Sequence, residues 1–485
     1  MKKCFDKNRY INSQIKRINQ RIELFKNKLY LEFGGKIFDD YHASRVLPGF
    51  EPDTKISMLY KLKDKIEFMI CINAEDVISQ KIRSDIGISY EQDLFRLIEQ
   101  LSNKGFYVGS VVITHYNNQE KIKSLTDKLD NLKIQYAYHY KIENYPIDVD
   151  YICSENGFGK NQYIKTKREL IVVTAPGPGS GKLATCLSQI YNDYQNNIKS
   201  GYAKFETFPV WNIELNHPIN LAYEAATVDL NDINMIDPFH YQKYKKIAIN
   251  YNRDIESFPI LQNLLKKIMN QDIYFSPTDM GVNMLKKGII DFNLASSSAK
   301  EEIVRRYFNI KLKVLKDYSK KYELDKIKSI MDKLNIDQNI REVYKFTKSL
   351  AVKNNKNYAG FFIDNKLISG KESELFEPSA AALLNTLKVI SNIDIDLDVL
   401  PFEIINQLLL LKKSNILQSS NKLKVYDVLT TIAIQAKFDK NCKLMFNNLN
   451  KLNNCEFHSS KLLSKSEEET LRKLGVNITQ ELINN

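Results

Sequence analysis

The chain has 485 residues, of which 43% are hydrophobic, and 70 basic against 58 acidic residues give it a formal net charge of +12. This length exceeds one ordinary core, so two or three domains are expected, and the hydrophobic fraction excludes a disordered chain. No apolar run approaches the roughly 20 residues that cross a bilayer, and no apolar segment follows the basic start. We therefore expect a cytoplasmic protein with no membrane partner.

The positive charge is spread along the whole chain and is not gathered in a basic arm. A solvated basic surface accounts for it better than a nucleic-acid groove, so nucleic acid is not an expected partner. The six cysteines include no C-x-x-C pair. This pattern is typical of scattered reduced thiols in a cytosol.

The first 150 residues alternate predicted strands and helices after an opening amphipathic helix. The helices are predicted over 9–26, 90–103 and 119–132, and the apolar strands over 28–33, 66–72, 107–114 and 134–138. Strands separated by helices of this length indicate βαβ units and a mostly parallel sheet. We therefore predict a Rossmann-like or P-loop-like α/β domain over 1–150.

The α/β pattern restarts after a connector around Tyr145-Pro146. Residues 170–174 form a continuous β-branched apolar run, as in a fully buried parallel strand, and a helix over 182–194 and a strand over 202–208 follow. The segment from 218 to 353 is mainly helical in pattern. A second α/β domain with a helical extension is therefore expected over 151–350.

The last third of the chain predicts a separate α+β domain over 351–485. Two strands, 358–363 and 366–369, flank Asp364-Asn365 and indicate a hairpin. Helices are predicted over 378–390, 402–412 and 424–436.

The most informative segment is the glycine-rich turn between the strand at 170–174 and the helix at 182–194. Glycines let backbone N–H groups converge on an anion, and the following helix directs its unpaired N–H groups to the same point. A lysine at the start of that helix adds a full positive charge. The predicted phosphate-binding residues are Gly177, Gly179, Ser180, Gly181, Lys182 and Thr185.

This turn departs from the standard phosphate loop, G-x-x-x-x-G-K-[ST]. Pro176 stands at the position of the first glycine, and Leu183 stands where a hydroxyl would hold Mg²⁺. Thr185, about one helical turn further on, is the available substitute. The anion cradle is better supported than the metal arrangement, and a merely structural glycine-rich turn is the alternative.

A second polar loop follows the strand at 28–33, where parallel sheets gather their ligand sites. It contains Gly34, Gly35, Asp39, His42 and Arg45. Because loops carry function but most polar loops do not, a binding loop and a solvated surface loop are both open.

The segment 203–254 supplies candidates for metal binding and proton transfer. We predict Asp229 and Asp232 as Mg²⁺ ligands, and Asp232, His240 and His217 as catalytic groups. Helix capping explains such residues equally well, as with Asp237 before Pro238, and the polar loop over 276–283 is best interpreted as a helix N-terminus. Motifs for acyl transfer, zinc hydrolysis and nicotinamide binding are absent from the sequence.

Several long strings resemble one bacterial family over nearly the whole chain. The strings cover 30–50, 173–182, 201–209, 222–227, 234–240 and 276–284. The family is an uncharacterised protein family (UPF class) known as domain of unknown function eighteen forty-six, and it is described by sequence and fold. The resemblance implies a cytoplasmic bacterial protein with an α/β N-terminal region and a distinct C-terminal region, and it transfers no catalytic residues.

Two functions therefore remain open. One is a phosphotransferase or ligase that uses ATP and Mg²⁺ and acts on a nucleotide or sugar phosphate. The other is a non-catalytic, homo-oligomeric protein that binds a phosphorylated metabolite. The missing hydroxyl after Lys182 favours the second function.

Overall fold

The computed structural model describes residues 3–26, 28–83, 87–117, 120–413 and 421–483. The chain divides into two compact units, one over residues 2–299 and the other over residues 300–485. Within the described residues, no helix is long and apolar enough to cross a membrane. All six cysteines are free thiols, as expected from their spacing.

The first unit is built on a seven-stranded sheet in the order β4-β3-β2-β5-β1-β6-β9, and every neighbouring pair is parallel. Its strands are β1 (Leu29–Phe33), β2 (Ile66–Asn73), β3 (Tyr107–Tyr116), β4 (Gln135–Tyr140), β5 (Leu170–Thr174), β6 (Gly201–Phe205) and β9 (Gly281–Val282). β5 lies in the middle with all its residues buried, which explains its unbroken apolar sequence. The predicted parallel α/β fold is confirmed.

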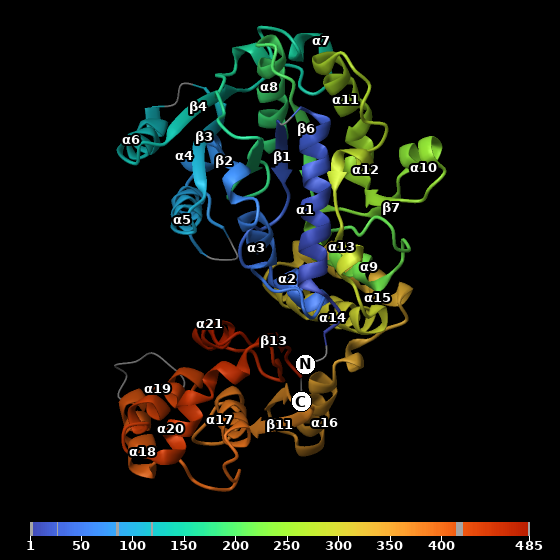
Figure 1. Ribbon diagram of the computed structural model, residues 1–485. Helices are drawn as coiled ribbons and strands as arrows, with labels where there is room; N and C mark the ends of the chain where they lie inside the picture. The colour runs from blue at the N-terminus through green and yellow to red at the C-terminus, as the bar shows by residue number, and fades with distance from the viewer. Residues whose placement is uncertain (1–2, 27, 84–86, 118–119, 414–420, 484–485) are drawn as a thin grey trace. The chain divides into compact units, whose positions relative to one another are not determined.

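Some helices of this unit pack along the sheet and connect its strands, and others lie farther from it (Figure 1). They are α1 (Lys7–Leu24), α2 (Tyr41–Val46), α3 (Thr54–Tyr60), α4 (Ala74–Ile78), α5 (Tyr90–Asn103), α6 (Lys123–Asn131), α7 (Val149–Ile152), α8 (Lys182–Gln195), α9 (Pro218–Ala226), α10 (Pro238–Tyr244), α11 (Asn252–Met269), α12 (Pro277–Met280) and α13 (Leu285–Gly288). α5 begins at a capping box formed by Ser89 and Gln92, and its apolar residues face the sheet. Gln119, the first residue of the helix predicted at 119–132, lies outside the described residues.

The structure differs from the expected division near residue 150. β5, from the second expected domain, pairs with β1 and β2, from the first, so the two regions share one sheet. Apolar periodicity identifies a buried strand but carries no information about which distant strand it pairs with. The structure also contains a short antiparallel hairpin, β7 (Asn234–Ile236) and β8 (Ile249–Tyr251), in the segment expected to be mainly helical.

The second unit carries a four-stranded mixed sheet in the order β11-β10-β12-β13. Its strands are β10 (Tyr358–Ile363), β11 (Lys366–Lys371), β12 (Glu456–Ser459) and β13 (Asn477–Gln480). The remaining helices of the chain are α14 (Phe292–Lys316), α15 (Lys321–Lys333), α16 (Glu342–Asn354), α17 (Pro378–Ile390), α18 (Phe402–Lys413), α19 (Val425–Gln435), α20 (Lys440–Asn447) and α21 (Lys465–Lys473). The predicted β10–β11 hairpin is confirmed, and both turn residues have positive φ, 49° at Asp364 and 60° at Asn365.

Candidate functional site

The glycine-rich turn lies at the carboxyl end of β5 and leads directly into α8. Gly179 and Gly181 have left-handed φ values of 73° and 76°. A Cβ on Gly177 would lie 2.2 Å from the ring of Tyr90, and a Cβ on Gly181 would lie 2.9 Å from the methyl group of Thr114. The turn therefore needs glycine for its backbone angles at two positions and for its packing against α5 and β3.

The internal hydrogen bonds of this turn use its carbonyl groups and leave several of its N–H groups available. The Ser180 hydroxyl donates to the Gly177 carbonyl at 2.7 Å, and the Thr114 hydroxyl donates to the Ser180 carbonyl at 3.0 Å. Within the described part of the chain, no protein acceptor bonds the N–H groups of Gly177, Gly179, Gly181 or Lys182. The first N–H groups of a helix likewise have no partner inside the helix.

Lys182 is the first residue of α8 and forms no salt bridge with any described residue. Burial raises the pKa of the Cys71 thiol on β2 to about 12, while the Lys182 ammonium lowers this pKa and the Glu32 carboxylate raises it. Glu32 lies on the same face of the sheet as Cys71, because it is in register with Val173, which is in register with Met69, two residues before Cys71.

The structure does not bring the predicted Mg²⁺ ligands together. Thr185 is fully buried, and its hydroxyl accepts a hydrogen bond from the Cys71 thiol at 3.4 Å. Asp229 is exposed, whereas Asp232 is buried 3.4 Å from the Arg253 guanidinium. Among the residues that the structure describes, no group of three or more His, Cys, Asp or Glu could hold a metal ion.

The two predicted proton-transfer histidines lie in helix caps and loop contacts. His217 caps α9, where its Nδ1 accepts the Ile219 N–H at 3.2 Å, and burial lowers its pKa. The Nδ1 of His240 lies 3.0 Å from the Ser276 hydroxyl. Asp237 caps α10, and Ser276 caps α12, so the capping interpretation of both is confirmed.

The second polar loop is held firmly by its own contacts. Gly34 donates its N–H to the Phe205 carbonyl at 3.1 Å, which ties the end of β1 to the end of β6. Asp40 caps α2 and pairs at 2.8 Å with the buried Lys55. Although burial raises the pKa of Asp40, the Lys55 ammonium brings that pKa below its ordinary value. The Asp40–Lys55 ion pair therefore stabilises the loop.

The other predicted residues of this loop lie in varied surroundings. Gly35 has a φ of 71°, Asp39 is exposed with a φ of 57°, and Arg45 lies in the last turn of α2. The His42 ring packs edge-on at 5.2 Å from the Tyr223 ring of α9. Because β1 and β5 are neighbours in the sheet, the loop and the glycine-rich turn begin at the ends of adjacent strands, while the printed contacts of the loop lead to β6 and α9.

A charged group that sequence reasoning did not assemble lies at the carboxyl ends of β1 and β6. The Lys204 ammonium lies 2.6 Å from a Glu206 oxygen and 2.7 Å from Asp254. Glu32 accepts a hydrogen bond from the Tyr202 hydroxyl at 2.6 Å. We call Glu32, Lys204, Glu206 and Asp254 the Lys204 cluster.

The Lys204 cluster holds more negative than positive charge. Burial raises the pKa of Glu206 to about 7, with Lys204 opposing this increase and Asp254 adding to it. Burial lowers the pKa of Lys204, but Asp254 and Glu206 together hold it above its ordinary value. Lys204 therefore stays charged, while Glu206 is able to take up or release a proton near neutral pH.

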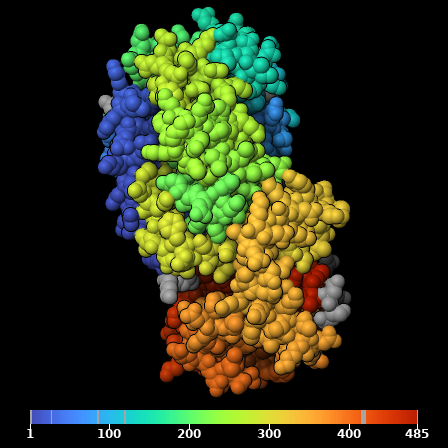
Figure 2. All heavy atoms as spheres, turned by 90° about the vertical axis from the view of Figure 1, so that its right-hand side faces the viewer, coloured from blue at the N-terminus to red at the C-terminus, as the bar shows by residue number. Residues whose placement is uncertain are grey.

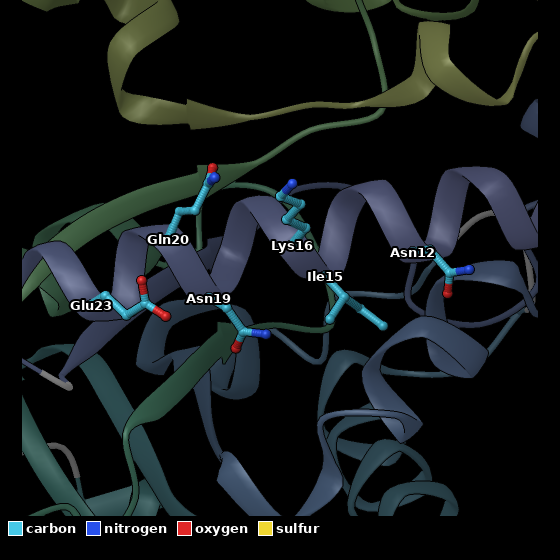
Figure 3. Close-up of a pocket in the computed structure, with 6 residues that line it drawn as sticks. All are labelled: Asn12, Ile15, Lys16, Asn19, Gln20 and Glu23. Carbon is cyan, nitrogen blue, oxygen red and sulfur yellow. The ribbon is translucent and has the colours of Figure 1, made fainter.

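A hollow along α1 is lined by Asn12, Ile15, Lys16, Asn19, Gln20 and Glu23 (Figure 3). In Figure 3, Lys16 and Gln20 point to one side of the helix, and Asn12 and Asn19 point to the other. Because all these side chains come from one helix, no second element presents polar groups to a ligand there. We assign no site to this hollow.

The fold and the groups at the carboxyl ends of the strands define the class of protein. It is an α/β protein whose parallel sheet carries a glycine-rich turn and a charged cluster at those ends. Residues 3–335 match the family described as domain of unknown function DUF1846, N-terminal, and residues 339–483 match the C-terminal domain of the same description. The chain therefore belongs to the DUF1846 family, which confirms the resemblance noted from the sequence.

Curated relatives cover almost the full length. The chain is 45% identical over 477 residues to UPF0371 protein SpyM50764 of Streptococcus pyogenes serotype M5 (strain Manfredo), spanning 98% of this chain and 97% of the relative. It is also 45% identical over 479 residues to UPF0371 protein str1377 of Streptococcus thermophilus (strain CNRZ 1066), spanning 99% of this chain and 97% of the relative.

Proposed function

We propose that this chain binds a phosphorylated small molecule, with its phosphate held by the turn 177–182. One observation carries the proposal: the turn bonds its own carbonyls internally and keeps the N–H groups of Gly177, Gly179, Gly181 and Lys182 without protein acceptors among the described residues. Amides in this state, ahead of a helix N-terminus, favour a negatively charged ligand. Lys182 adds a cation at the same point, and it forms no salt bridge with any residue that the structure describes.

Binding without a resident metal fits the residues around the turn. Leu183 offers no side-chain oxygen to Mg²⁺, and the hydroxyl of Thr185 is buried against Cys71. A phosphate held by amides and an ammonium needs no metal to balance its charge. These features favour a non-catalytic binding protein over an enzyme with its own Mg²⁺ site.

A thermal-shift experiment tests this proposal, because a ligand that binds the native state raises the melting temperature. The panel contains inorganic phosphate, sugar phosphates and nucleotides, each with Mg²⁺ and with EDTA. We expect phosphorylated ligands to stabilise the wild type and Lys199→Ala equally in both buffers, because Lys199 is exposed beyond the far end of α8. Lys182→Ala should lose the shift.

Two results would contradict the proposal. The first is a complete absence of shifts in the wild type across the panel. The second is a shift that survives Lys182→Ala at full size, since the anion would then bind elsewhere.

A phosphotransferase or ligase that uses ATP and Mg²⁺ is the second candidate. The specific observation in its favour is Glu206, because burial raises its pKa to about 7, where a carboxyl group can transfer protons. This candidate requires a shift with ATP that depends on Mg²⁺ and release of ADP or AMP that Glu206→Gln abolishes. A shift insensitive to Mg²⁺ with no turnover supports the binding protein.

A homo-oligomeric state is part of the first candidate, and an apolar arm favours it. The arm consists of the β7–β8 hairpin and α10, and Figure 2 shows this segment in green at the surface of the face turned to the viewer. Its exposed apolar side chains include Met235 at 43% and Ile247 at 61% exposure. Such side chains gathered on one projection favour contact with a second copy.

A further inference from the structure

The hydroxyl groups of Ser180, Thr114 and Tyr90 lie against the glycine-rich turn, and they differ in what they bond. Ser180 donates to the Gly177 carbonyl at 2.7 Å, and Thr114 donates to the Ser180 carbonyl at 3.0 Å. Both of these hydroxyl protons therefore hold the turn in its shape. The Tyr90 hydroxyl forms no hydrogen bond with any residue that the structure describes.

Tyr90 is the first residue of α5, and its ring packs against the start of the turn. A Cβ on Gly177 would lie 2.2 Å from a ring carbon and 2.6 Å from the hydroxyl oxygen. Because a carbon–carbon bond is about 1.5 Å long, that oxygen lies no more than about 4 Å from the Gly177 Cα. The hydroxyl is thus beside the first of the N–H groups of the turn that have no protein acceptor.

Several contacts fix the position of Tyr90 without using its hydroxyl. The capping box of Ser89 and Gln92 sets the start of α5, and the Tyr90 N–H donates to the Lys81 carbonyl at 2.9 Å. The Lys81 ammonium, which pairs with Asp76, lies 5.0 Å from the centre of the Tyr90 ring, within the range of a cation–π contact. The ring is therefore held at the turn with its hydroxyl available to a further partner.

The burial of Tyr90 indicates that a partner completes this arrangement. Tyr90 is 8% exposed, and a mostly buried hydroxyl without a hydrogen bond costs free energy. The turn itself is open to solvent, because Gly179 is exposed and Gly177 and Lys182 are half-buried. A ligand is therefore able to reach the turn and the hydroxyl together.

We propose that the Tyr90 hydroxyl donates a hydrogen bond to the phosphate group that is held by the turn 177–182. This inference rests on the proposed phosphate site and adds to it a side-chain donor from a second helix. The site then combines the free N–H groups of the turn, the Lys182 ammonium and one neutral hydroxyl.

The groups available at this point favour an anion over a cation. The free N–H groups of the turn and the Lys182 ammonium can only donate, and the Tyr90 hydroxyl is able to donate as well. A ligand that meets them must supply acceptors, and a phosphate group supplies several oxygens. One phosphate oxygen bound to the Gly177 N–H leaves another for Tyr90.

Titration calorimetry with inorganic phosphate and with glucose 6-phosphate tests the inference. Tyr90→Phe keeps the ring and removes only the hydroxyl. It should weaken the binding of both probes by the same factor, about tenfold, because the lost hydrogen bond goes to the phosphate group itself. Tyr10→Phe is the matched control, because the Tyr10 hydroxyl is also buried and unpartnered but packs among Phe5 and Phe50. This control should leave the affinity for both probes unchanged.

The melting temperature of the ligand-free protein separates a ligand contact from a structural one. Tyr90→Phe should not lower it, because the hydroxyl has no protein partner to lose. Thr114→Val should lower it, because this change removes the donor to the Ser180 carbonyl. A lower melting temperature in Tyr90→Phe overturns the inference, since the hydroxyl would then bond within the protein.

The binding outcomes separate this inference from the phosphate site. Phosphate binding that depends on Lys182 but is unaffected by Tyr90→Phe overturns the inference and leaves the phosphate site standing. A loss in Tyr90→Phe for glucose 6-phosphate alone also overturns it, because the hydroxyl would then contact the sugar. Absence of binding of both probes to the wild type overturns the inference, and the phosphate site falls with it if the thermal-shift panel also gives no shift.

Discussion

Glycines in the 170–182 segment are required for two different reasons, and single substitutions distinguish them. Gly179 has a φ of 73° and open space around its missing Cβ, so Gly179→Ala should lower the free energy of unfolding by about 1 kcal/mol through backbone strain alone. Gly177→Ala forces the Tyr90 ring to move and should cost about 2 kcal/mol. Urea unfolding measures both.

Gly87→Ala is the matched control for this comparison. Gly87 has a φ of 71° and nothing near its missing Cβ, so its substitution should cost the same as Gly179→Ala. A larger loss at Gly179 than at Gly177 would contradict the packing described for this turn.

Glu206 should make stability depend on pH in a recognisable way. Its folded-state pKa is about 7, against an ordinary value of 4.5, because burial disfavours its charged form. The folded state therefore binds the proton more tightly, so the stabilisation is complete below about pH 4.5 and is lost as pH rises through about 7. Glu206→Gln should remove this slope, so the free energy of unfolding of the wild type minus that of the variant should fall by about 3 kcal/mol between these limits.

Urea unfolding at a series of pH values checks the Glu206 prediction. Other carboxyl groups titrate in the same range, which is why the difference between the two proteins is the informative quantity. An unchanged difference from pH 4 to pH 8 would show that Glu206 titrates normally.

At the scale of elements, the β7–β8 hairpin and α10 should mediate self-association. Met235→Asp places a charge among the exposed apolar side chains of the arm, and Ile236 and Ile247 are its exposed neighbours in the hairpin region. We expect the wild type to elute as a homo-oligomer in size-exclusion chromatography with light scattering, and Met235→Asp to shift it toward monomer. Tyr426→Asp, a 63% exposed site in the second unit, is the control. A monomeric wild type would refute the prediction.

The elements also show how far the sequence alone reaches. The helices at 90–103 and 378–390 begin and end where the periodicity predicts, because each carries a strong apolar face or a clear start signal. The strands β7, β8, β12 and β13 have only three or four residues, too few to establish a period of two, and escaped prediction.

The candidate site likewise has one part that the sequence predicted and one part that it did not. The glycine-rich turn is a local feature, so sequence reasoning located it directly. The Lys204 cluster joins Glu32 to Lys204 and Asp254 through strand pairing and helix packing, which no local pattern reveals. One signal was present: Tyr202, Lys204 and Glu206 alternate along a strand, and such spacing places polar groups on one face.

Across the whole molecule, the free thiols should react very little with thiol reagents until the chain unfolds. Five of the six cysteines are buried, and only Cys153 is partly exposed. Burial raises the pKa of Cys71 to about 12 and that of Cys153 to about 11, so the reactive thiolate is scarce at neutral pH. We expect a thiol reagent such as Ellman's to modify at most one cysteine in the native protein and all six in denaturant. Cys153→Ser should abolish the native reaction.

Leu183, which follows Lys182, has a practical consequence for anyone who isolates this protein. A phosphate ester that is bound by amides and an ammonium needs no divalent ion to bridge it to a side-chain oxygen. Chelators would therefore not remove it. We therefore expect the natural ligand to remain bound to the protein during purification in buffers that contain EDTA. Acid extraction of the purified protein followed by mass spectrometry would reveal the mass of this ligand. The Lys182→Ala protein, purified in the same way, should yield no such ligand.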